Sequence, residues 1–248
     1  MIQHAIKAIT LAAGILAAPV LAEPLALPSK SEARQISVVV DRGITHTNQL
    51  PWSLRPLRKA MVGGAAMSIA DLRALADRKD SLAALKLVKL MRSGAMTETA
   101  SDMAFYAAVA AGAGRKGMLD DMIAALYRLS PGVEPAERMS HYIRVLYGHA
   151  WAGNTRAQDA LIALNGEDRL FGPMSDATRD RIVTTGGPRM VLSLALKDLA
   201  RADLDEAGLV RVRGYLERAE RNGDLAIRAM AQTLTAQVEA RLATRVVN

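Results

Sequence analysis

A glycine-rich run is the first feature of the sequence that could carry chemistry. Residues 112–117 read GAGRKG and match the G-x-G-x-x-G pattern of dinucleotide-binding loops. That chemistry requires a strand before the glycines, so that they lead into a helix whose N-terminus meets the pyrophosphate. Here the alanine-rich residues 102–111 predict a helix, and Lys116 is not followed by the Ser or Thr of a Walker loop. The run therefore predicts a turn between two helices and no cofactor.

Residue types for covalent catalysis or metal binding are few. The chain has no cysteine and no G-x-S-x-G elbow, which removes thiolate nucleophiles and cysteine-based metal sites. His141 and His149 fit on one helix, but eight residues correspond to about 12 Å of rise, too far for both to bind one metal ion directly. Glu137 lies one turn before His141, a spacing typical of a local salt bridge. We therefore expect no metal site.

Carboxylates do not single out a catalytic pair either. Asp120 and Asp121 are neighbours on a predicted helix, so they point in different directions, and they lie near its N-terminus, where negative charge offsets the dipole. Paired carboxylates of the glycosidase kind cannot be identified from one sequence, because nearly any helix pair offers candidates. No catalytic residue is predicted. A secreted helical hydrolase that acts on the cell wall is the alternative function.

One group of residues on a single predicted helix favours a role in binding a partner. On a helix predicted for residues 135–152, one side carries a core stripe: Met139, Tyr142, Ile143, Leu146 and Ala150. The other side, within about 120° at 100° per residue, carries the candidate partner-binding residues: His141, Arg144, Tyr147 and Trp151. Binding energy concentrates in Arg, Tyr and Trp, and Gly148 among them would let a partner backbone come close. The alternative is that this second face packs against a neighbouring repeat.

The elements that must position these residues are helices. From Ser68 onward apolar residues recur at three- and four-residue spacing, and strand-type alternation is nearly absent. Pairs of small residues, seven positions apart across a polar turn, recur along this region at steps of 34, 40 and 69 residues: Ala76/Ala83, Ala110/Gly117, Ala150/Ala157 and Ala219/Ala226. A helix-turn-helix unit has roughly 34 residues. The sequence predicts an all-α fold, an array of antiparallel helix pairs over residues 68–248.

Two of these turns carry a family resemblance. Residues 150–158 (AWAGNTRAQ) and 219–226 (AERNGDLA) resemble the inter-repeat turn of Sel1-like repeats, relatives of the tetratricopeptide repeat. The resemblance implies a right-handed superhelix, an α-solenoid, whose concave face binds peptides or proteins. The first unit departs from the pattern, because it has Arg78-Lys79-Asp80 where a glycine is expected. We therefore expect a divergent array.

The N-terminal region is of another kind. Residues 1–22 combine a single cation, Lys7, with an apolar run over 8–21 and small residues before Glu23, which predicts a secretory signal peptide and a periplasmic or secreted bacterial protein. Residues 23–67 are interrupted by prolines and predict an irregular arm or linker. Only Ile36 to Val40 is typical of an extended run, a strand that docks elsewhere.

The charge and the amino-acid composition limit the classes of partner that we expect the protein to bind. The formal charge of +7 is interspersed along the predicted helices, which is typical of a solvated surface and allows weak attraction to anionic surfaces. Two Phe, five Tyr and two Trp offer few stacking platforms, so nucleic-acid binding is not expected. No transmembrane segment is expected after signal cleavage. The leading hypothesis is an exported helical-repeat protein that binds a peptide or protein in the cell envelope, as a scaffold or assembly factor.

Overall fold

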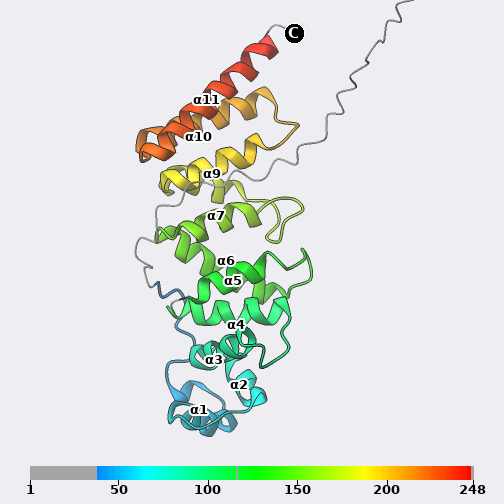
Figure 1. The fold of residues 1–248 in the computed structure, drawn as a ribbon, viewed down its shortest axis with the longest axis vertical. Coiled ribbons are helices and arrows are strands. Elements are labelled where there is room, and N and C mark those ends of the chain that lie inside the picture. The colour runs from blue at the N-terminus through cyan, green and yellow to red at the C-terminus, as the bar shows by residue number, and fades with distance from the viewer. Residues whose placement is uncertain (1–37, 116, 247–248) are drawn as a thin grey trace, which may run out of the picture.

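The computed structural model describes residues 38–115 and 117–246, and this part of the chain is helical, without strands (Figure 1). Two short 3-10 turns, η1 (Thr47–Gln49) and η2 (Trp52–Leu54), precede eleven α-helices. The helices are α1 (Arg55–Val62), α2 (Ile69–Ala76), α3 (Ser81–Arg92), α4 (Ala100–Gly112), α5 (Met118–Leu126), α6 (Ala136–Trp151), α7 (Thr155–Leu164), α8 (Asp176–Thr185), α9 (Pro188–Leu199), α10 (Glu206–Asn222) and α11 (Leu225–Val246). The predicted all-α fold is confirmed. No helix within the described ranges is long and apolar enough to cross a bilayer.

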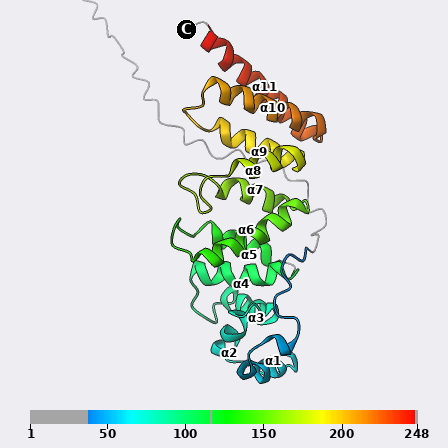
Figure 2. The same ribbon diagram turned by 180° about the vertical axis from the view of Figure 1, so that it is seen from behind.

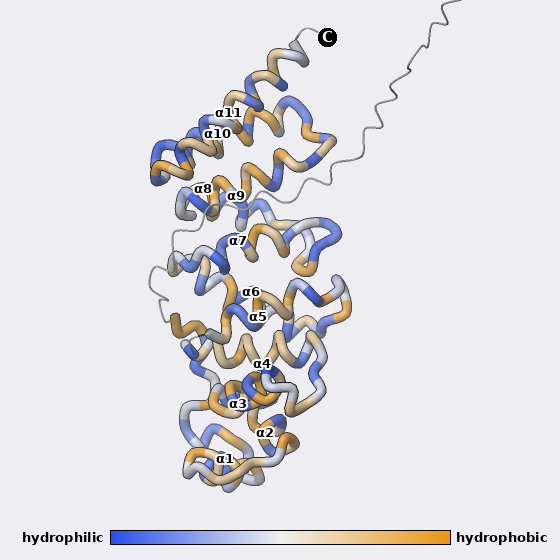
Figure 3. Tube along the Cα trace, viewed as in Figure 1, coloured by the Kyte–Doolittle hydropathy of each residue, from blue (hydrophilic) through white to orange (hydrophobic). Residues whose placement is uncertain are grey.

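The helices follow one another along the long axis of the molecule, from α1 at one end to α11 at the other (Figures 1 and 2). Each packs mainly on helices one or two places away in the chain: α4 contacts α3, α5 and α6, and α7 contacts α5, α6 and α9. Apolar positions recur in every helix (Figure 3), so the core continues along the stack. Every residue from Met103 to Gly112 of α4 is buried, and its many Ala and Gly residues let three neighbours approach closely.

The turns between helices fall where the small-residue pairs predict them. Ala76 and Ala83 lie at the α2–α3 turn and Ala150 and Ala157 at the α6–α7 turn, and all four are fully buried. A side-chain cap begins several of the helices, as at Ser68 before α2, whose hydroxyl accepts the Asp71 N–H at 3.1 Å. The last pair differs from the prediction, because Ala219 is buried whereas its partner on α11, Ala226, is exposed.

The glycine-rich run lies at the α4–α5 turn, as predicted. Gly112 ends α4, and Gly114 and Gly117 have φ angles of 83° and 82°, in the left-handed region that favours glycine. No strand precedes them in the described chain, so the geometry of a dinucleotide loop is absent there.

The segment before Ser68 is more ordered than the predicted irregular arm of residues 23–67. Residues 55–62 form α1, because Pro56 stands in the first turn, where its missing N–H is not needed. The sequence did not predict this helix because Pro56 was interpreted only as a residue that interrupts helices. Before α1, an extended segment runs along the edge of α3 and α4 (Figure 2). The predicted signal peptide, residues 1–22, and residues 23–37 lie outside the described residues.

Candidate functional site

The four candidate residues lie on α6, but the structure divides them between two environments. His141 is buried, with 2 % of its surface exposed, whereas Arg144 is exposed. Tyr147 and Trp151 are half-buried. His141 and Gly148 lie beneath the extended segment before α1, and Tyr147 and Trp151 lie against α8. The predicted face is therefore two adjoining surfaces.

The first surface is covered by residues 38–44, which we call the arm. The N–H groups of Val40 and Asp41 both donate to the carbonyl of Gly112, at 2.8 and 3.0 Å, and the N–H of Ile44 donates to the carbonyl of Lys79 at 3.0 Å. Gly112 is the last residue of α4, and carbonyls in the last turn of a helix have no partner within the helix. Of the extended run predicted for residues 36–40, the described part, residues 38–40, forms no strand; Val40 docks on the end of α4.

Glycines make room for the arm. A Cβ atom on Gly148 would lie 2.3 Å from Cγ2 of Val40, so any side chain there would displace the arm. Gly43 has a φ of 57°, and a Cβ atom on it would lie 2.1 Å from the carbonyl oxygen of Lys79. At Gly148 the sequence predicted the approach of a partner backbone; the structure instead places the Val40 side chain of the same chain there. The notch beside Gly148 and the carbonyls of Gly112 and Lys79 form what we call the seat.

Charged groups surround Asp41 in the seat. One of its carboxylate oxygens accepts the N–H of Gly43 at 3.0 Å, and the other lies 3.6 Å from Nζ of Lys79. Burial acts to raise the pKa of Asp41, but the Gly43 N–H, Lys79, His141 and Arg144 outweigh it and lower that pKa. The aspartate is therefore held as an anion among positive and neutral groups.

His141 is the neutral member of this group. Burial, Lys79 and Arg144 lower its pKa to about 4, against an opposing effect of Asp41, whose Oδ2 lies 3.8 Å from Nδ1. The Ala108 carbonyl is near enough to favour the protonated form slightly, yet neither ring nitrogen makes a hydrogen bond of ordinary geometry to a described residue. The predicted salt bridge to Glu137 is not formed, because His141 faces the arm and Glu137 faces solvent.

Lys79 explains the departure from the glycine expected at the first repeat turn. It adopts a φ of 64° in the left-handed region, where a side chain costs about 1 to 2 kcal/mol. Its carbonyl receives Ile44 and its ammonium group approaches Asp41. The lysine therefore takes the conformation of the missing glycine and supplies two contacts that a glycine could supply only in part.

The second surface is a stacked group, which we call the ledge: Tyr147, Trp151 and Arg181. The two rings stack with centroids 5.3 Å apart and planes 10° apart, and the Arg181 guanidinium, from α8, lies 4.7 Å from the centroid of the Trp151 ring. The Tyr147 hydroxyl donates to Thr178 on α8 at 3.2 Å. The ledge thus braces α8 against α6 and leaves its arginine exposed.

Carboxylates elsewhere pair with arginines of neighbouring helices. Asp120 on α5 lies 3.0 Å from Arg156 on α7, and Asp121 lies 3.7 Å from Arg92 on α3. Burial raises the pKa of Asp121; Arg92 opposes that rise, and Asp120 and Glu98 add to it. Among the described residues, no group of three or more His, Cys, Asp or Glu side chains could hold a metal ion.

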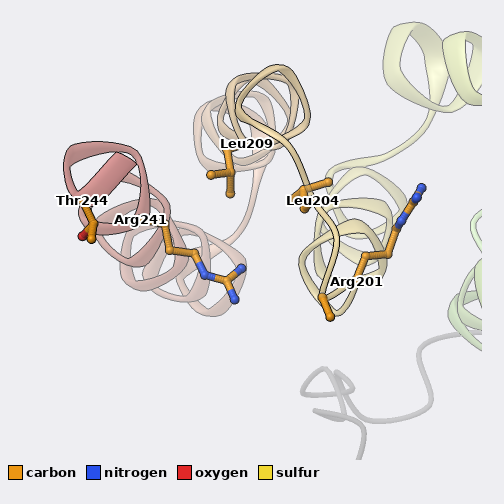
Figure 4. A pocket seen from close by; sticks show the side chains of 6 residues that line it. Arg201, Leu204, Leu209, Arg241 and Thr244 are labelled. Atoms are coloured by element: carbon orange, nitrogen blue, oxygen red, sulfur yellow. The ribbon is translucent and has the colours of Figure 1, made fainter. Parts of the chain in front are cut away.

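A surface hollow of about 270 Å³ lies near the C-terminal end, between α11 and the loop that joins α9 to α10 (Figure 4). Its lining residues include no carboxylate: Arg201, Ala202, Leu204, Leu209, Arg241 and Thr244. Arg241 reaches into the space between the helices, whereas Arg201 turns away from it and pairs with Asp203 at 3.1 Å.

Sequence reasoning named the ledge aromatics but missed several residues that complete the two surfaces. Val40 and Asp41 were part of a predicted extended run without a destination, and Lys79 stood out only as a missing glycine. Comparison with protein-family models, with curated proteins and with solved structures finds no match. Function is therefore inferred from the geometry of the seat and the ledge.

Proposed function

We propose that this chain is an exported bacterial protein that binds a peptide or protein partner in the cell envelope, as a scaffold or assembly factor. We further propose that its helices form an α-solenoid of antiparallel pairs, a divergent relative of Sel1-like and tetratricopeptide repeats. The packing of helices on near neighbours in the chain supports this proposal. So do the buried alanines at the α2–α3 and α6–α7 turns.

The observation that carries the binding function is the ledge beside Arg144. Two stacked aromatic rings under an exposed arginine offer a rigid apolar platform with a cationic edge, a combination in which binding energy concentrates. Arg144 is exposed next to the platform, and it also favours the ionised form of Asp41 in the seat. A partner that combines an apolar side chain with a carboxylate fits this surface.

The test uses charge reversal, because Tyr147 and Trp151 also brace α8. The variant Arg181→Glu should lose capture of its partner from a periplasmic extract while its melting temperature stays near that of the wild type. Arg211→Glu is the matched control, because it makes the same charge change at an exposed arginine of α10. Undiminished capture by Arg181→Glu would refute the ledge as the binding surface.

Export is tested separately, on the leader pattern of residues 1–22. Cleavage after Ala22 should leave Glu23 as the first residue of the exported protein, as measured by mass spectrometry. A membrane-bound product that retains Met1 would refute this compartment. The alternative function, a secreted hydrolase of the cell wall, needs carboxylates that converge in a pocket, and the hollow near α11 supplies none.

A further inference from the structure

The most exposed large apolar side chain of the described residues is Trp52, with 80 % of its surface exposed. It lies in η2, which leads directly into α1, the first helix of the stack (Figure 1). The guanidinium of Arg55 lies 4.6 Å from the centroid of the Trp52 ring and donates to the carbonyls of Leu50 and Asn48, both at 3.0 Å. The ring is therefore held on a fixed base, with most of its apolar area in solvent.

The exposed residues of α1 continue the face on which this ring lies. Trp52, Pro56 and Lys59 follow one another at four- and three-residue spacing, which places them on one side of a helix. All three are exposed, and so is Val62, three residues after Lys59, at 60 %. The side of α1 that carries Met61 is buried. This exposed face, which we call the α1 end, consists of Trp52, Arg55, Pro56, Lys59 and Val62.

The α1 end carries charge of one sign only. Residues 42–70 contain no Asp or Glu, although the whole chain has 25. Arg55 donates to carbonyl oxygens, and neither its charge nor that of Lys59 is paired with a carboxylate of the described chain. The opposite end of the stack differs, because Arg213 on α10 pairs with Glu239 on α11 at 3.1 Å. The α1 end is therefore complementary to a uniformly negative surface.

We propose that the α1 end docks on a lipid bilayer that contains anionic phospholipids. A tryptophan ring is favoured at the boundary between headgroups and acyl chains, where its body is in an apolar environment and its N–H stays near water. Lys59 and Arg55 lie beside the ring and approach the lipid phosphates, and each cation near an anionic bilayer strengthens binding by about fivefold. This function is separate from partner binding at the ledge and rests on the proposed function only for export.

A protein partner fits the α1 end less well than a bilayer does. Protein interfaces gain specificity from charges of both signs arranged to complement the partner, whereas this end has cations alone. The loop after α1, residues 63–66 (GGAA), is exposed and offers almost no side chains that a protein partner would pack between. The α1 end also lies at an extremity of the stack, so a flat surface reaches it while α6, farther along, stays free for the partner at the ledge (Figure 1).

The test measures binding of the exported protein to lipid vesicles, with no partner protein present. Vesicles of phosphatidylglycerol and phosphatidylcholine in equal parts are compared with vesicles of phosphatidylcholine alone by sedimentation at low salt. We expect binding to the anionic vesicles only, and weaker binding as salt is added. Lys59→Glu should weaken binding at least about tenfold, because it replaces an attractive charge by a repulsive one. Arg211→Glu, the same change on an exposed part of α10, should weaken it much less.

Insertion of the ring is measured on Trp52 itself. The chain has two tryptophans, so in Trp151→Phe the fluorescence comes from Trp52 alone. Its emission should shift to the blue on anionic vesicles and become protected from quenching by acrylamide. Trp52→Ala should weaken vesicle binding at least about tenfold, while its melting temperature stays near that of the wild type because the ring is exposed. Leu225→Ala, which truncates an exposed apolar side chain of α11, should bind as the wild type does.

The proposal is overturned if the wild type does not bind anionic vesicles, or if the emission of Trp52 does not change on them. It is also overturned if Lys59→Glu and Arg211→Glu weaken binding equally, since that result would show diffuse attraction of a basic protein. Loss of partner capture in Trp52→Ala, without vesicle binding by the wild type, would identify the α1 end as a protein-binding surface instead. Partner capture that depends on Arg181 would show that the ledge function survives these failures, and vesicle binding without such capture would show the reverse.

Discussion

The seat and the ledge adjoin each other on α6 and are built from opposite kinds of residue. The seat uses glycines, a lysine in a left-handed turn and a buried neutral histidine, and the arm fills it. The ledge uses two large aromatic rings and an arginine; the rings pack against the core and α8 and stay half-buried. Small residues on this helix face thus mark a contact that the chain makes with itself, whereas the large amphipathic ones form the surface at which we propose that a partner binds.

The strongest way to break the seat is to remove the carboxylate that anchors the connection between the arm and α1. Asp80 is 1 % exposed, caps α3 through two backbone N–H groups, and lies 2.6 Å from Nε of Arg58. The same guanidinium binds the carbonyl of Thr45 and the hydroxyl of Thr47. Asp80→Ala should lower the free energy of unfolding by about 3 to 5 kcal/mol in urea titrations. A loss below about 1 kcal/mol would contradict this anchoring role.

The second largest effect is expected from low pH, which should reduce the stability of the folded protein through His141 in the seat. The pKa of His141 is lowered from 6.5 to about 4, so the unfolded chain binds a proton between these values and the folded chain does not. Stability is therefore complete above pH 6.5 and falls as the pH drops toward 4, by about 2 kcal/mol at pH 5. His141→Gln should reduce this slope and leave the part due to His149, whose pKa is also lowered by burial. An unchanged slope in the variant would exclude His141 as its source.

On the ledge, Trp151→Ala should have a smaller effect. The ring is half-buried, so about 1 to 2 kcal/mol of stability should be lost, below the roughly 3 to 5 kcal/mol of a fully buried aromatic. Thermal melting followed by circular dichroism measures it. A loss at the upper end of the buried range would identify the ledge as core and weaken its role as a partner surface.

The smallest expected change in stability comes from replacing two helical glycines, Gly214 and Gly148, with alanine, and the two replacements can be compared directly. Alanine stabilises the interior of a helix by about 0.5 to 1 kcal/mol relative to glycine, so Gly214→Ala in α10, where the added Cβ atom meets nothing, should raise the melting temperature. Gly148→Ala should lose that gain, because its Cβ atom displaces Val40, and trypsin should cleave the loosened arm after Arg42 faster than in the wild type. Equal stabilisation by both would mean that the arm does not need the notch.

Much of the fold could be predicted from the sequence because an α-helix is determined largely by residues that are close together in the sequence. Three- and four-residue spacing predicts the helices, and the small-residue pairs predict their turns. The candidate site was predicted only in part. Periodicity identifies a second face on α6, but it does not reveal that Val40, about a hundred positions earlier, covers Gly148. His141 lies between Asp41 and Phe105 of α4, contacts that the spacing on α6 does not reveal either. Helix α1 was missed because Pro56 can also begin a helix.

The central claim, that the arm fills a seat beside an open ledge, is tested most directly by amide hydrogen exchange of the wild-type protein. The N–H groups of Val40, Asp41 and Ile44 should be protected, because the first two donate to the carbonyl of Gly112 and the third donates to the carbonyl of Lys79. In Gly43→Val all three should exchange as in an unfolded chain, while the amides of α4 and α6 stay protected. Rapid exchange of these three amides in the wild type would contradict the account.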